Sequence, residues 1–353
     1  MINVCAQAGR IDQAEKILGQ FTSFSPYSAT GSTEIEEDVA PSVRTWNVLL
    51  SSCTAQGDTR KAKRFWLQMK ENGIQPDIVS YNTLLNCYAH SLKRRTKNDK
   101  TNAQEAVESI WRRLRHDPNV TPNHITFLAV VNFWINQGDP KRAEMFVLDM
   151  ASVSQQSVQN DDTNVHHNVP APSRSLFHYV LTSWGEYRAP KKAEELLLKM
   201  AELSDDHGFD VRPTTETYNR LLNCWAKSMK VESGERAEVI LREMEGLNSL
   251  GDNEATPDIY SYNSVLNAWS NSGDAAALTR IDNLILEMIL QGKPSLLPDS
   301  FSYGTWLKAI CLDGTDKIQR LKEVIKTMKI HNFKPNEYVR QRIQNMGGTE
   351  KRS

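Results

Sequence analysis

The sequence predicts an all-α fold, an α-α superhelix (α-solenoid) of helix–turn–helix repeats. Three regularities support this prediction. A proline precedes an aromatic residue by five positions at seven places, each aromatic residue opens a helical apolar pattern, and an alanine precedes a methionine by seven positions in a following helix. Such self-similarity is typical of repeat architectures, in which each repeat buries its apolar face against its neighbours.

The proline–aromatic pairs mark where each repeat begins. They are Pro41–Trp46, Pro76–Tyr81, Pro122–Phe127, Pro172–Phe177, Pro213–Tyr218, Pro257–Tyr262 and Pro298–Tyr303. The residue after each of these prolines, and after Pro335, is Ser, Asp, Asn or Thr. Because these side chains accept a backbone N–H at a helix start, we expect a helix to begin after each of them.

The first helix of each repeat is predicted from apolar residues at i, i+3, i+4 and i+7, counted from the aromatic residue. Tyr218, Leu221, Leu222 and Trp225 form one such set, and this spacing places them on one helical face. We expect the tryptophans on this face to pack in the core rather than against a base, and the cysteines of the first helices to be buried. These residues are Trp134, Trp184, Trp225, Trp269, Cys53, Cys87 and Cys224.

The second helix of a repeat is marked by an alanine two turns before a methionine. The pairs are Ala62–Met69, Ala143–Met150, Ala193–Met200 and Ala237–Met244. The small residue permits close helix approach, and the methionine fills the remaining gap on the same side. Gly57, Gly138 and Gly273 fall between the two helices, where a tight turn needs a permissive backbone.

The repeats are expected at residues 43–77, 78–123, 124–173 (with a long loop), 174–214, 215–258, 259–299 and 300–336. Residues 1–42 form a partial repeat plus an insertion, and residues 337–353 form a C-terminal capping helix and tail. Met1–Phe21 matches the middle of a repeat rather than its start, which predicts an N-terminally truncated chain.

Three insertions are predicted as loops from their polar composition. Thr22–Ala40 and Ala151–Val169 are expected after a second helix, and the basic segment Leu92–Asn102 is expected between the two helices of its repeat. We interpret the basic segment as a solvated surface loop.

Composition excludes several function classes. The 353 residues include 42 Lys and Arg against 43 Asp and Glu, which excludes a strongly cationic nucleic-acid binder. No apolar run of membrane-spanning length is present. The five cysteines contain no CxxC pair, and His166–His167 has no second ligand pair, so we expect no metal site. The chain carries no hydrolase, metalloprotease or nucleotide-binding motif; hence we expect neither an enzyme nor a cofactor.

The repeat openings "IVSYNTLLNCY", "TETYNRLLNCW" and "IYSYNSVLNAW" and the closings "ENGIQPD" and "ATPD" resemble the pentatricopeptide repeat family, as a P-type array. The resemblance covers residues 43–336. Tetratricopeptide repeats share the helix pair but lack the Tyr-Asn opening and the Pro-Asp closing. The resemblance implies binding of single-stranded RNA in a mitochondrion or plastid, one nucleotide per repeat with the 5′ end at the N-terminal repeats. It also implies that the protein guides RNA processing, stability, splicing or translation.

In this family the fifth and the last residue of a repeat select the base. By resemblance, base recognition falls to Asn47/Asp77, Asn82/Asn123, His178/Thr214, Asn219/Asp258, Asn263/Asp299 and the final Asn336. The repeats with Leu128 and Gly304 at the fifth position offer no side-chain hydrogen bond to a base. Asn with Asp implies uracil and Asn with Asn a pyrimidine, so the implied target is U-Y-n-n-U-U-n, where Y is a pyrimidine and n is unassigned.

The chemistry of these pairs fits that role. A carboxamide offers a donor and an acceptor to the edge of an unpaired base, and a neighbouring carboxylate fixes its orientation, directly or through water. The closing residues also suit helix capping, and the two roles are compatible.

Stacking and phosphate contacts follow from two further family positions. The second residue of a repeat is expected to sandwich a base, and Arg44, Val79, Ile125, Tyr260 and Phe301 suit that role. Ser175 and Glu216, at the same position, do not. At the thirteenth position, where the family places lysine, only Lys227 supplies a phosphate contact.

Two other functions remain open from the sequence. The chain is also interpretable as a protein–protein interaction scaffold of the tetratricopeptide type, or as the non-catalytic fragment of a larger RNA-processing protein. The long insertions offer contacts for a protein partner, and no membrane partner is expected.

Overall fold

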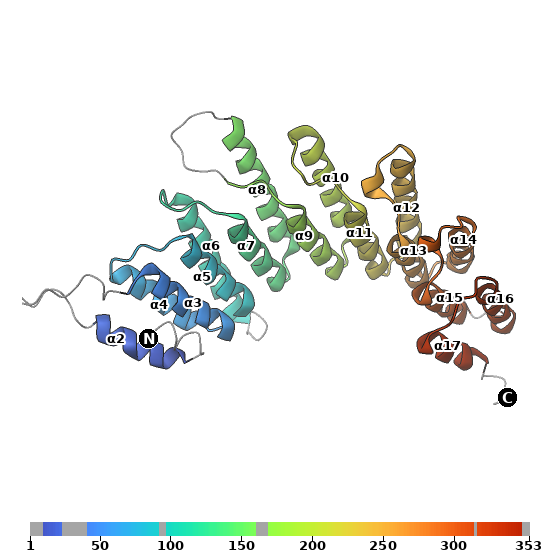
Figure 1. Cartoon of the computed structure of the whole chain (residues 1–353), viewed down its shortest axis with the longest axis horizontal. Coiled ribbons are helices and arrows are strands. Elements are labelled where there is room, and N and C mark those ends of the chain that lie inside the picture. Colours follow the sequence, from blue (N-terminus) through green and yellow to red (C-terminus); the bar gives the residue numbers. More distant parts are fainter. Residues whose placement is uncertain (1–9, 23–40, 92–96, 160–168, 314–315, 348–353) are drawn as a thin grey trace, which may run out of the picture. The chain divides into compact units, whose positions relative to one another are not determined.

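The computed structural model describes residues 10–22, 41–91, 97–159, 169–313 and 316–347 (Figure 1). Within these ranges the chain forms 16 α-helices and two short 3₁₀ helices, η3 (Asn253–Ala255) and η4 (Pro294–Leu296), and no strand. The chain divides into two compact parts, an N-terminal block (residues 1–180) and a C-terminal block (residues 181–353). The prediction of an all-α fold of helix–turn–helix repeats is confirmed.

The N-terminal block contains α2 (Ile11–Thr22) and three helix pairs. The pairs are α3 (Val43–Gln56) with α4 (Thr59–Glu71), α5 (Ile78–His90) with α6 (Lys97–His116), and α7 (His124–Gln137) with α8 (Pro140–Gln159). Within the block, α3 packs on α5 and α5 on α7. First helices therefore follow one another side by side. The boundary between the blocks falls inside α9 (Arg174–Glu186).

The C-terminal block repeats the same arrangement. It holds α10 (Pro190–His207), α11 (Thr215–Ser228), α12 (Ser233–Ser249), α13 (Ile259–Ser272), α14 (Ala277–Leu290), α15 (Ser300–Asp313), α16 (Lys317–Ile330) and α17 (Glu337–Gly347). The first helices α11, α13, α15 and α17 pack successively, and α12 packs on both α11 and α13. The second helices α12, α14 and α16 thus each cover the seam between two first helices.

Local signals place the helix ends as the sequence predicts. The side chains of Asp77, Asn123 and Asp258 each accept the backbone N–H of the residue three positions later. The hydroxyl of that later residue accepts the backbone N–H of the capping residue. Two otherwise unpaired donors at the helix start are thereby satisfied. Gly57 and Gly138 end their first helices in the left-handed conformation, with φ of 68° and 78°, a conformation that glycine adopts without steric cost.

The core consists of the apolar faces predicted from the helical spacing. Trp134, Trp184, Trp225 and Trp269 are all buried, and so are Cys53, Cys87 and Cys224. Their expected packing role is confirmed. Burial raises the pKa of the Cys53 thiol to about 11, so this side chain behaves as a small apolar group near neutral pH.

Two predicted loops are partly helical. Helix α6 begins at Lys97, so residues 97–102 of the basic segment belong to a helix whose buried stripe contains Ala103, Val107 and Leu114. Helix α8 runs to Gln159, and its buried Ala151 and Ser154 continue the stripe of Met150. In both cases burial of one face outweighs the polar composition that suggested a loop. Residues 92–96, 160–168 and 23–40 lie outside the described residues, whereas Val169, at the end of the second segment, is buried.

Successive repeats of the C-terminal block are joined at their second helices by a Trp–carboxylate–Arg ladder. Trp225 Nε1 donates to Glu194 Oε1 at 2.6 Å, and Arg236 Nε donates to the same oxygen at 2.9 Å. The two further rungs are Trp269–Glu238–Arg280 (Nε1 to Oε2 3.0 Å, Nη1 to Oε1 3.8 Å) and Trp306–Asp282–Arg320 (Nε1 to Oδ1 2.7 Å, Nη1 to Oδ2 2.9 Å). Each rung ties a first-helix indole to a carboxylate of the preceding repeat.

Candidate nucleic-acid interface

A carboxamide network joins the first two complete repeats where α5 begins. Asn47 Nδ2 donates to Asp77 Oδ1 at 3.0 Å, and the Ser80 hydroxyl donates to Asn47 Oδ1 at 2.6 Å. The same Asp77 oxygen caps α5 by accepting the Ser80 backbone N–H at 2.8 Å. The helix cap therefore also anchors the carboxamide of the preceding repeat, so the expected capping role and the orientation of Asn47 rest on one carboxylate.

Two junctions of the C-terminal block reproduce this network. Asn219 Nδ2 donates to Asp258 Oδ1 at 3.0 Å, and the Ser261 hydroxyl lies 2.6 Å from Asn219 Oδ1. Asn263, Asp299 and Ser302 repeat the pattern with distances of 3.2 and 2.6 Å. In each case the asparagine is the fifth residue of one repeat, the aspartate is its last residue, and the serine is the third residue of the next. The structure thus brings together three of the residue pairs that the sequence nominates.

The junction at Asn82 differs from these three. Asn82 Nδ2 donates to Asn123 Oδ1 at 3.2 Å, and that oxygen also accepts the Thr126 backbone N–H at 3.1 Å. The Thr126 hydroxyl bonds back to Asn123, and Asn82 Oδ1 is buried without a hydrogen-bond partner among the described residues. One hydrogen bond holds this carboxamide, where two hold the others.

The networks leave defined groups available for a ligand. Each asparagine of the Asn–Asp–Ser type uses one N–H and one lone pair, so a second N–H and a second lone pair remain. Within the described structure, Oδ2 of Asp77, Asp258 and Asp299 accepts no hydrogen bond. Burial raises the pKa of Asp77, but the hydrogen bonds from the Ser80 N–H, the Asn47 amide and the Ser80 hydroxyl hold it below the ordinary value of an aspartate overall. An ionised acceptor therefore stands beside the Asn47 amide near neutral pH.

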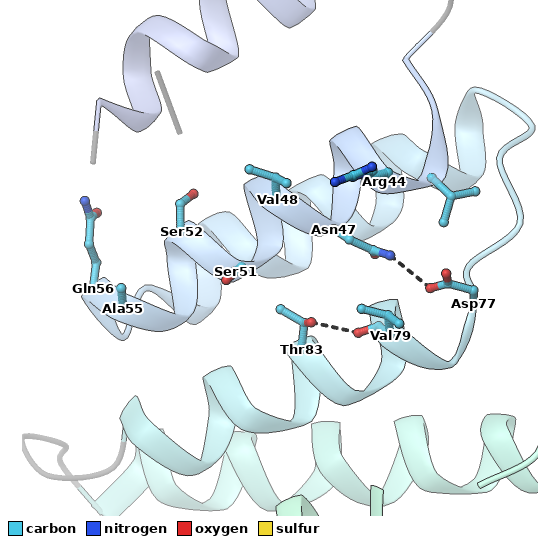
Figure 2. Close-up of a pocket in the computed structure, with 11 residues that line it drawn as sticks. Arg44, Asn47, Val48, Ser51, Ser52, Ala55, Gln56, Asp77, Val79 and Thr83 are labelled. Carbon is cyan, nitrogen blue, oxygen red and sulfur yellow. Dashed lines mark hydrogen bonds between the residues drawn. The ribbon is translucent and has the colours of Figure 1, made fainter. Parts of the chain in front are cut away.

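An open hollow surrounds the first of these networks (Figure 2). Arg44, Asn47, Asp77 and Val79 line it together with residues on the inner turns of α3, such as Ser51. Arg44 and Val79 are the second residues of successive repeats, and both are exposed. The hollow therefore pairs a polar edge with two side chains able to cover the faces of a planar ring.

Exposed side chains recur at the second position of other repeats. The exposed fractions are 51% for Val79, 52% for Ile125, 71% for Tyr260 and 51% for Phe301. Large apolar side chains left open in this periodic way provide surfaces on which a base can stack. Glu216, at the same position, is paired with Arg220 at 2.7 Å.

The remaining nominated residues lie at helix starts or in the core. His178 is buried in the N-terminal block. Thr214 begins α11 in the C-terminal block and is linked there to Thr217, whose hydroxyl accepts the Thr214 N–H at 3.1 Å. Asn336 caps α17 by accepting the Val339 N–H at 3.0 Å.

One aromatic residue on this face was missed from the sequence. A Cβ added to Gly304 would lie 2.7 Å from Cε1 of Tyr338. The ring thus fills the space of the fifth-position side chain, and Arg342 lies 4.9 Å from its centroid. Because Tyr338 is the second residue after Asn336, extension of the repeat register into α17 was the signal that could have identified it.

Among the thirteenth positions of the repeats, all of which are described, Lys227 is the one lysine or arginine. Lys227 is exposed in the last turn of α11. Two other thirteenth positions hold asparagines that brace neighbouring first helices, since Asn136 donates to the Ala89 carbonyl and Asn271 to the Ala226 carbonyl, each at 3.0 Å. Lys308, which the sequence did not nominate, donates to Asn271 Oδ1 at 2.5 Å. Burial and the Arg342 charge lower its pKa.

Other kinds of site receive no support from the described residues. Among them, no cluster of three or more His, Cys, Asp or Glu side chains is placed to hold a metal ion. None of the described helices is both long and apolar enough to span a bilayer.

Comparison with family models and curated proteins relates the chain to repeat proteins of one kind. Residues 41–90 match a model described as PPR repeat family, and residues 1–24 match a PPR repeat model. The chain is 24% identical over 198 residues to pentatricopeptide repeat-containing protein At5g25630 of Arabidopsis thaliana, covering 56% of this chain and 29% of that protein. It is 25% identical over 105 residues to PPR5, chloroplastic, of Zea mays, covering 30% and 20%. Over 82 residues it is 28% identical to At5g15010, mitochondrial, of Arabidopsis thaliana, covering 22% and 14%. The chain thus spans less than a third of these relatives.

A solved structure matches nearly the whole chain. The crystal structure of the pentatricopeptide repeat protein PPR10 in complex with an 18-nt psaJ RNA element aligns with 98% of this chain and 42% of that protein. The TM-score is 0.50 and the sequence identity 21%. At this identity the match shows a shared fold of helical repeats.

Proposed function

Since the chain belongs to the pentatricopeptide repeat family, we propose that it binds single-stranded RNA, with one nucleotide at each repeat. The observation that carries the proposal is the carboxamide network that recurs at three repeat junctions. At each, an asparagine amide is held by a helix-capping aspartate while one N–H, one amide lone pair and one carboxylate oxygen stay available. A purely capping role for the aspartate would not require the asparagine.

The available groups are complementary to uracil. Its Watson–Crick edge presents an N–H donor between two carbonyl acceptors, so the free Asp258 oxygen can accept from the base while the Asn219 N–H donates to it. Direct contact and a bridging water both satisfy this pairing. The same reasoning assigns uracil to Asn47/Asp77 and Asn263/Asp299.

The Asn82 junction presents the opposite polarity. Because Asn123 Oδ1 caps α7 and accepts from Asn82, the Asn123 group left for a ligand is its NH₂. A donor at this place suits the ring nitrogen acceptor of cytosine. The target of the array is then U-Y-n-n-U-U-n, with the unassigned positions at the Leu128, His178 and Gly304 repeats.

Stacking supplies the sequence-independent part of the affinity. We infer that Arg44, Val79, Ile125, Tyr260 and Phe301 cover base faces. Stacking on an aromatic side chain, here Tyr260 or Phe301, contributes about 1–3 kcal/mol per base. With Lys227 as the nominated phosphate contact, we expect a shallow dependence of affinity on salt. Relatives named chloroplastic or mitochondrial favour an organellar location, where the bound RNA would be guided to processing, splicing, stabilisation or translation by partner proteins.

A binding titration tests the proposal. An oligonucleotide carrying UCAAUUA within adenine flanks is compared with one carrying purines at the four assigned positions, at two salt concentrations. We expect at least tenfold tighter binding of the first, since four edge contacts each contribute about 0.5–1.5 kcal/mol. Equal affinities would overturn the proposal, and binding of neither RNA would favour a protein-interaction scaffold.

The variant Asn219→Thr makes the test specific to one repeat. A hydroxyl beside the Asp258 carboxylate offers acceptors to the two adjacent donors of guanine, so the preference at the fifth nucleotide should move from uracil to guanine. The preference at the first nucleotide, opposite Asn47, serves as the internal control and should stay unchanged. A variant that weakens binding equally for all four bases would place Asn219 in a structural role.

A further inference from the structure

A buried serine occupies the same place in all three Asn–Asp junctions. Ser80, Ser261 and Ser302 are the third residues of α5, α13 and α15, and none of them is exposed to solvent. A hydroxyl in such a position is costly to bury unless its hydrogen bonds are satisfied. The partners of these hydroxyls therefore indicate what they stabilise.

The hydroxyl hydrogen is directed to the asparagine. Ser261 Oγ lies 2.6 Å from Asn219 Oδ1 and 3.1 Å from Asp258 Oδ1. That Asp258 oxygen already accepts the Ser261 N–H at 2.9 Å and the Asn219 amide at 3.0 Å. A hydroxyl has a single hydrogen, and the nearer oxygen is the one with the fewer donors. The Ser261 oxygen in turn accepts the Asp258 N–H at 3.1 Å, which completes its bonding.

Two partners together fix the carboxamide, because each acts on a different end of it. The carboxylate accepts only, so it holds the NH₂ end, and the hydroxyl holds the carbonyl end. With both ends held, the amide plane cannot turn about its last torsion, which is otherwise broad for asparagine. The remaining N–H and lone pair then face the ligand in one orientation.

The Asn82 junction shows what happens without this second contact. Its third-position residue is Thr126, whose hydroxyl bonds to Asn123 at 3.1 Å. Asn82 Oδ1 stays without a partner among the described residues. A hydroxyl is present at both kinds of junction, but it reaches the fifth-position amide only where the residue is serine and the cap is aspartate.

We propose that Ser80, Ser261 and Ser302 are positioning residues for base recognition, which lock the carboxamides of Asn47, Asn219 and Asn263 in the orientation that selects uracil. The proposal rests on the proposed RNA-binding function. It adds a third residue, located in the next repeat, to the pair that specifies each base. Loss of one hydroxyl should reduce discrimination at one nucleotide and leave the others unchanged.

The experiment compares Ser261→Ala with Thr126→Ala as a matched control. Both substitutions remove a third-position hydroxyl that accepts a backbone N–H at a helix start, but only Ser261 touches a fifth-position amide. For Ser261→Ala we expect the uracil-to-cytosine affinity ratio at the fifth nucleotide to fall about three- to tenfold, the effect of one net hydrogen bond. The ratio at the first nucleotide should be unchanged, and Thr126→Ala should leave the ratio at the second nucleotide unchanged.

A second measurement needs no RNA. In the free protein, the Asn219 side-chain NH₂ protons should exchange with solvent about three- to tenfold faster in Ser261→Ala, because the amide has lost one of its two restraints. Those of Asn82 should be unaffected by Thr126→Ala. If the wild type showed no uracil preference, the RNA proposal would fail while this exchange comparison still decided whether the serine locks the amide.

Two results would overturn the positioning role. One is a Ser261→Ala protein whose fifth-nucleotide ratio and Asn219 exchange rate both stay within twofold of the wild type. The other is an equal loss of discrimination in Thr126→Ala, which would show that the hydroxyl acts through the helix cap and not through the carboxamide.

Discussion

Helix α11 carries two polar side chains that both reach a neighbouring repeat of the C-terminal block, and the two contacts differ in kind. Asn219, near its start, bonds forward to Asp258 and Ser261. Trp225, two turns later, bonds back to Glu194, which also binds Arg236. The indole has only one N–H, and the Glu194 carboxylate that accepts it also accepts two hydrogen bonds from Arg236. The carboxamide still has a donor and an acceptor to offer.

Under the proposed RNA-binding function, this difference separates a stabilising contact from a recognition contact within one helix. A buried indole whose single N–H is already bonded has no donor left for a ligand, so its contribution is to hold the repeats together. An open network on a half-buried amide contributes less to stability and keeps its groups for an outside partner. On α13 the same contrast of hydrogen-bond partners holds between Trp269 and Asn263, although the Asn263 side chain is itself buried.

The largest expected effect comes from removing the indole of Trp225. In Trp225→Ala we expect the free energy of unfolding of the C-terminal block to fall by about 3–5 kcal/mol, since a buried aromatic ring is replaced by a cavity. Because Trp225 is 1% exposed, the space left by the ring is closed to solvent and stays a cavity. Urea denaturation followed by circular dichroism measures the loss.

The matched control is Trp225→Phe, which keeps a buried aromatic ring but removes the N–H donor and part of the ring volume. Glu194 remains paired with Arg236, so the expected loss is about 1–2 kcal/mol, from one hydrogen bond and a small cavity. If Trp225→Ala were as mild as Trp225→Phe, the ladder would not hold these repeats together and the proposed division of roles would be wrong.

An intermediate effect is expected from converting the Asn82 junction into the Asn–Asp–Ser type found at the other three junctions. The double variant Asn123→Asp with Thr126→Ser supplies a carboxylate cap and a serine hydroxyl next to Asn82. We expect the preference at the second nucleotide to move from cytosine to uracil by about three- to tenfold, because the cap now accepts where it formerly donated. Affinities for RNAs differing only at that nucleotide measure the change.

Stability gives the control for this double variant. The helix cap of α7 is kept, since aspartate and asparagine cap about equally well, so the urea midpoint should barely move. A preference that stayed with cytosine would show that the polarity of the last residue does not select the base.

The sequence was sufficient for the repeat pattern but not for every helix boundary or contact. The proline–aromatic spacing located the helix starts because it reflects capping and one buried stripe, both of which are local. The helical parts of the 97–102 and 151–159 segments escaped prediction because the neighbouring helices that bury Ala103 and Ala151 are not visible in local composition.

The residues of the candidate site likewise fall into those that the sequence predicted and those that only the structure identified. Asn47 and Asp77 were nominated from the repeat register, which carries one repeat's pattern onto the next. The roles of Ser80 and Tyr338 depend on which atoms face each other across a junction, as does the pairing of Lys308 with Asn271. Such contacts follow from packing and not from spacing along the chain.

The smallest expected effect concerns the charge of Asp77, which connects capping with recognition. Burial raises the pKa of this carboxyl, while the hydrogen bonds from Ser80 and Asn47 lower it, and the net pKa lies below the ordinary value of an aspartate. A pKa that is lower in the folded than in the unfolded state contributes stability above the unfolded value. That contribution is lost as the pH falls through the folded value. Hence it should be constant from pH 7 to about pH 5 and decline below about pH 4.

The variant Asn47→Ala removes one of the hydrogen bonds that lower this pKa. We expect the pKa of Asp77 to move up toward its ordinary value, and carboxyl ¹³C NMR titration measures both proteins directly. Asn219→Ala, which touches Asp258 and not Asp77, should leave the value unchanged. An Asp77 pKa that did not respond to Asn47→Ala would mean that the cap alone holds the charge. The Asn47 amide would then accept the orientation that the carboxylate imposes without stabilising its charge, and the geometry of the network would be set by the helix cap alone.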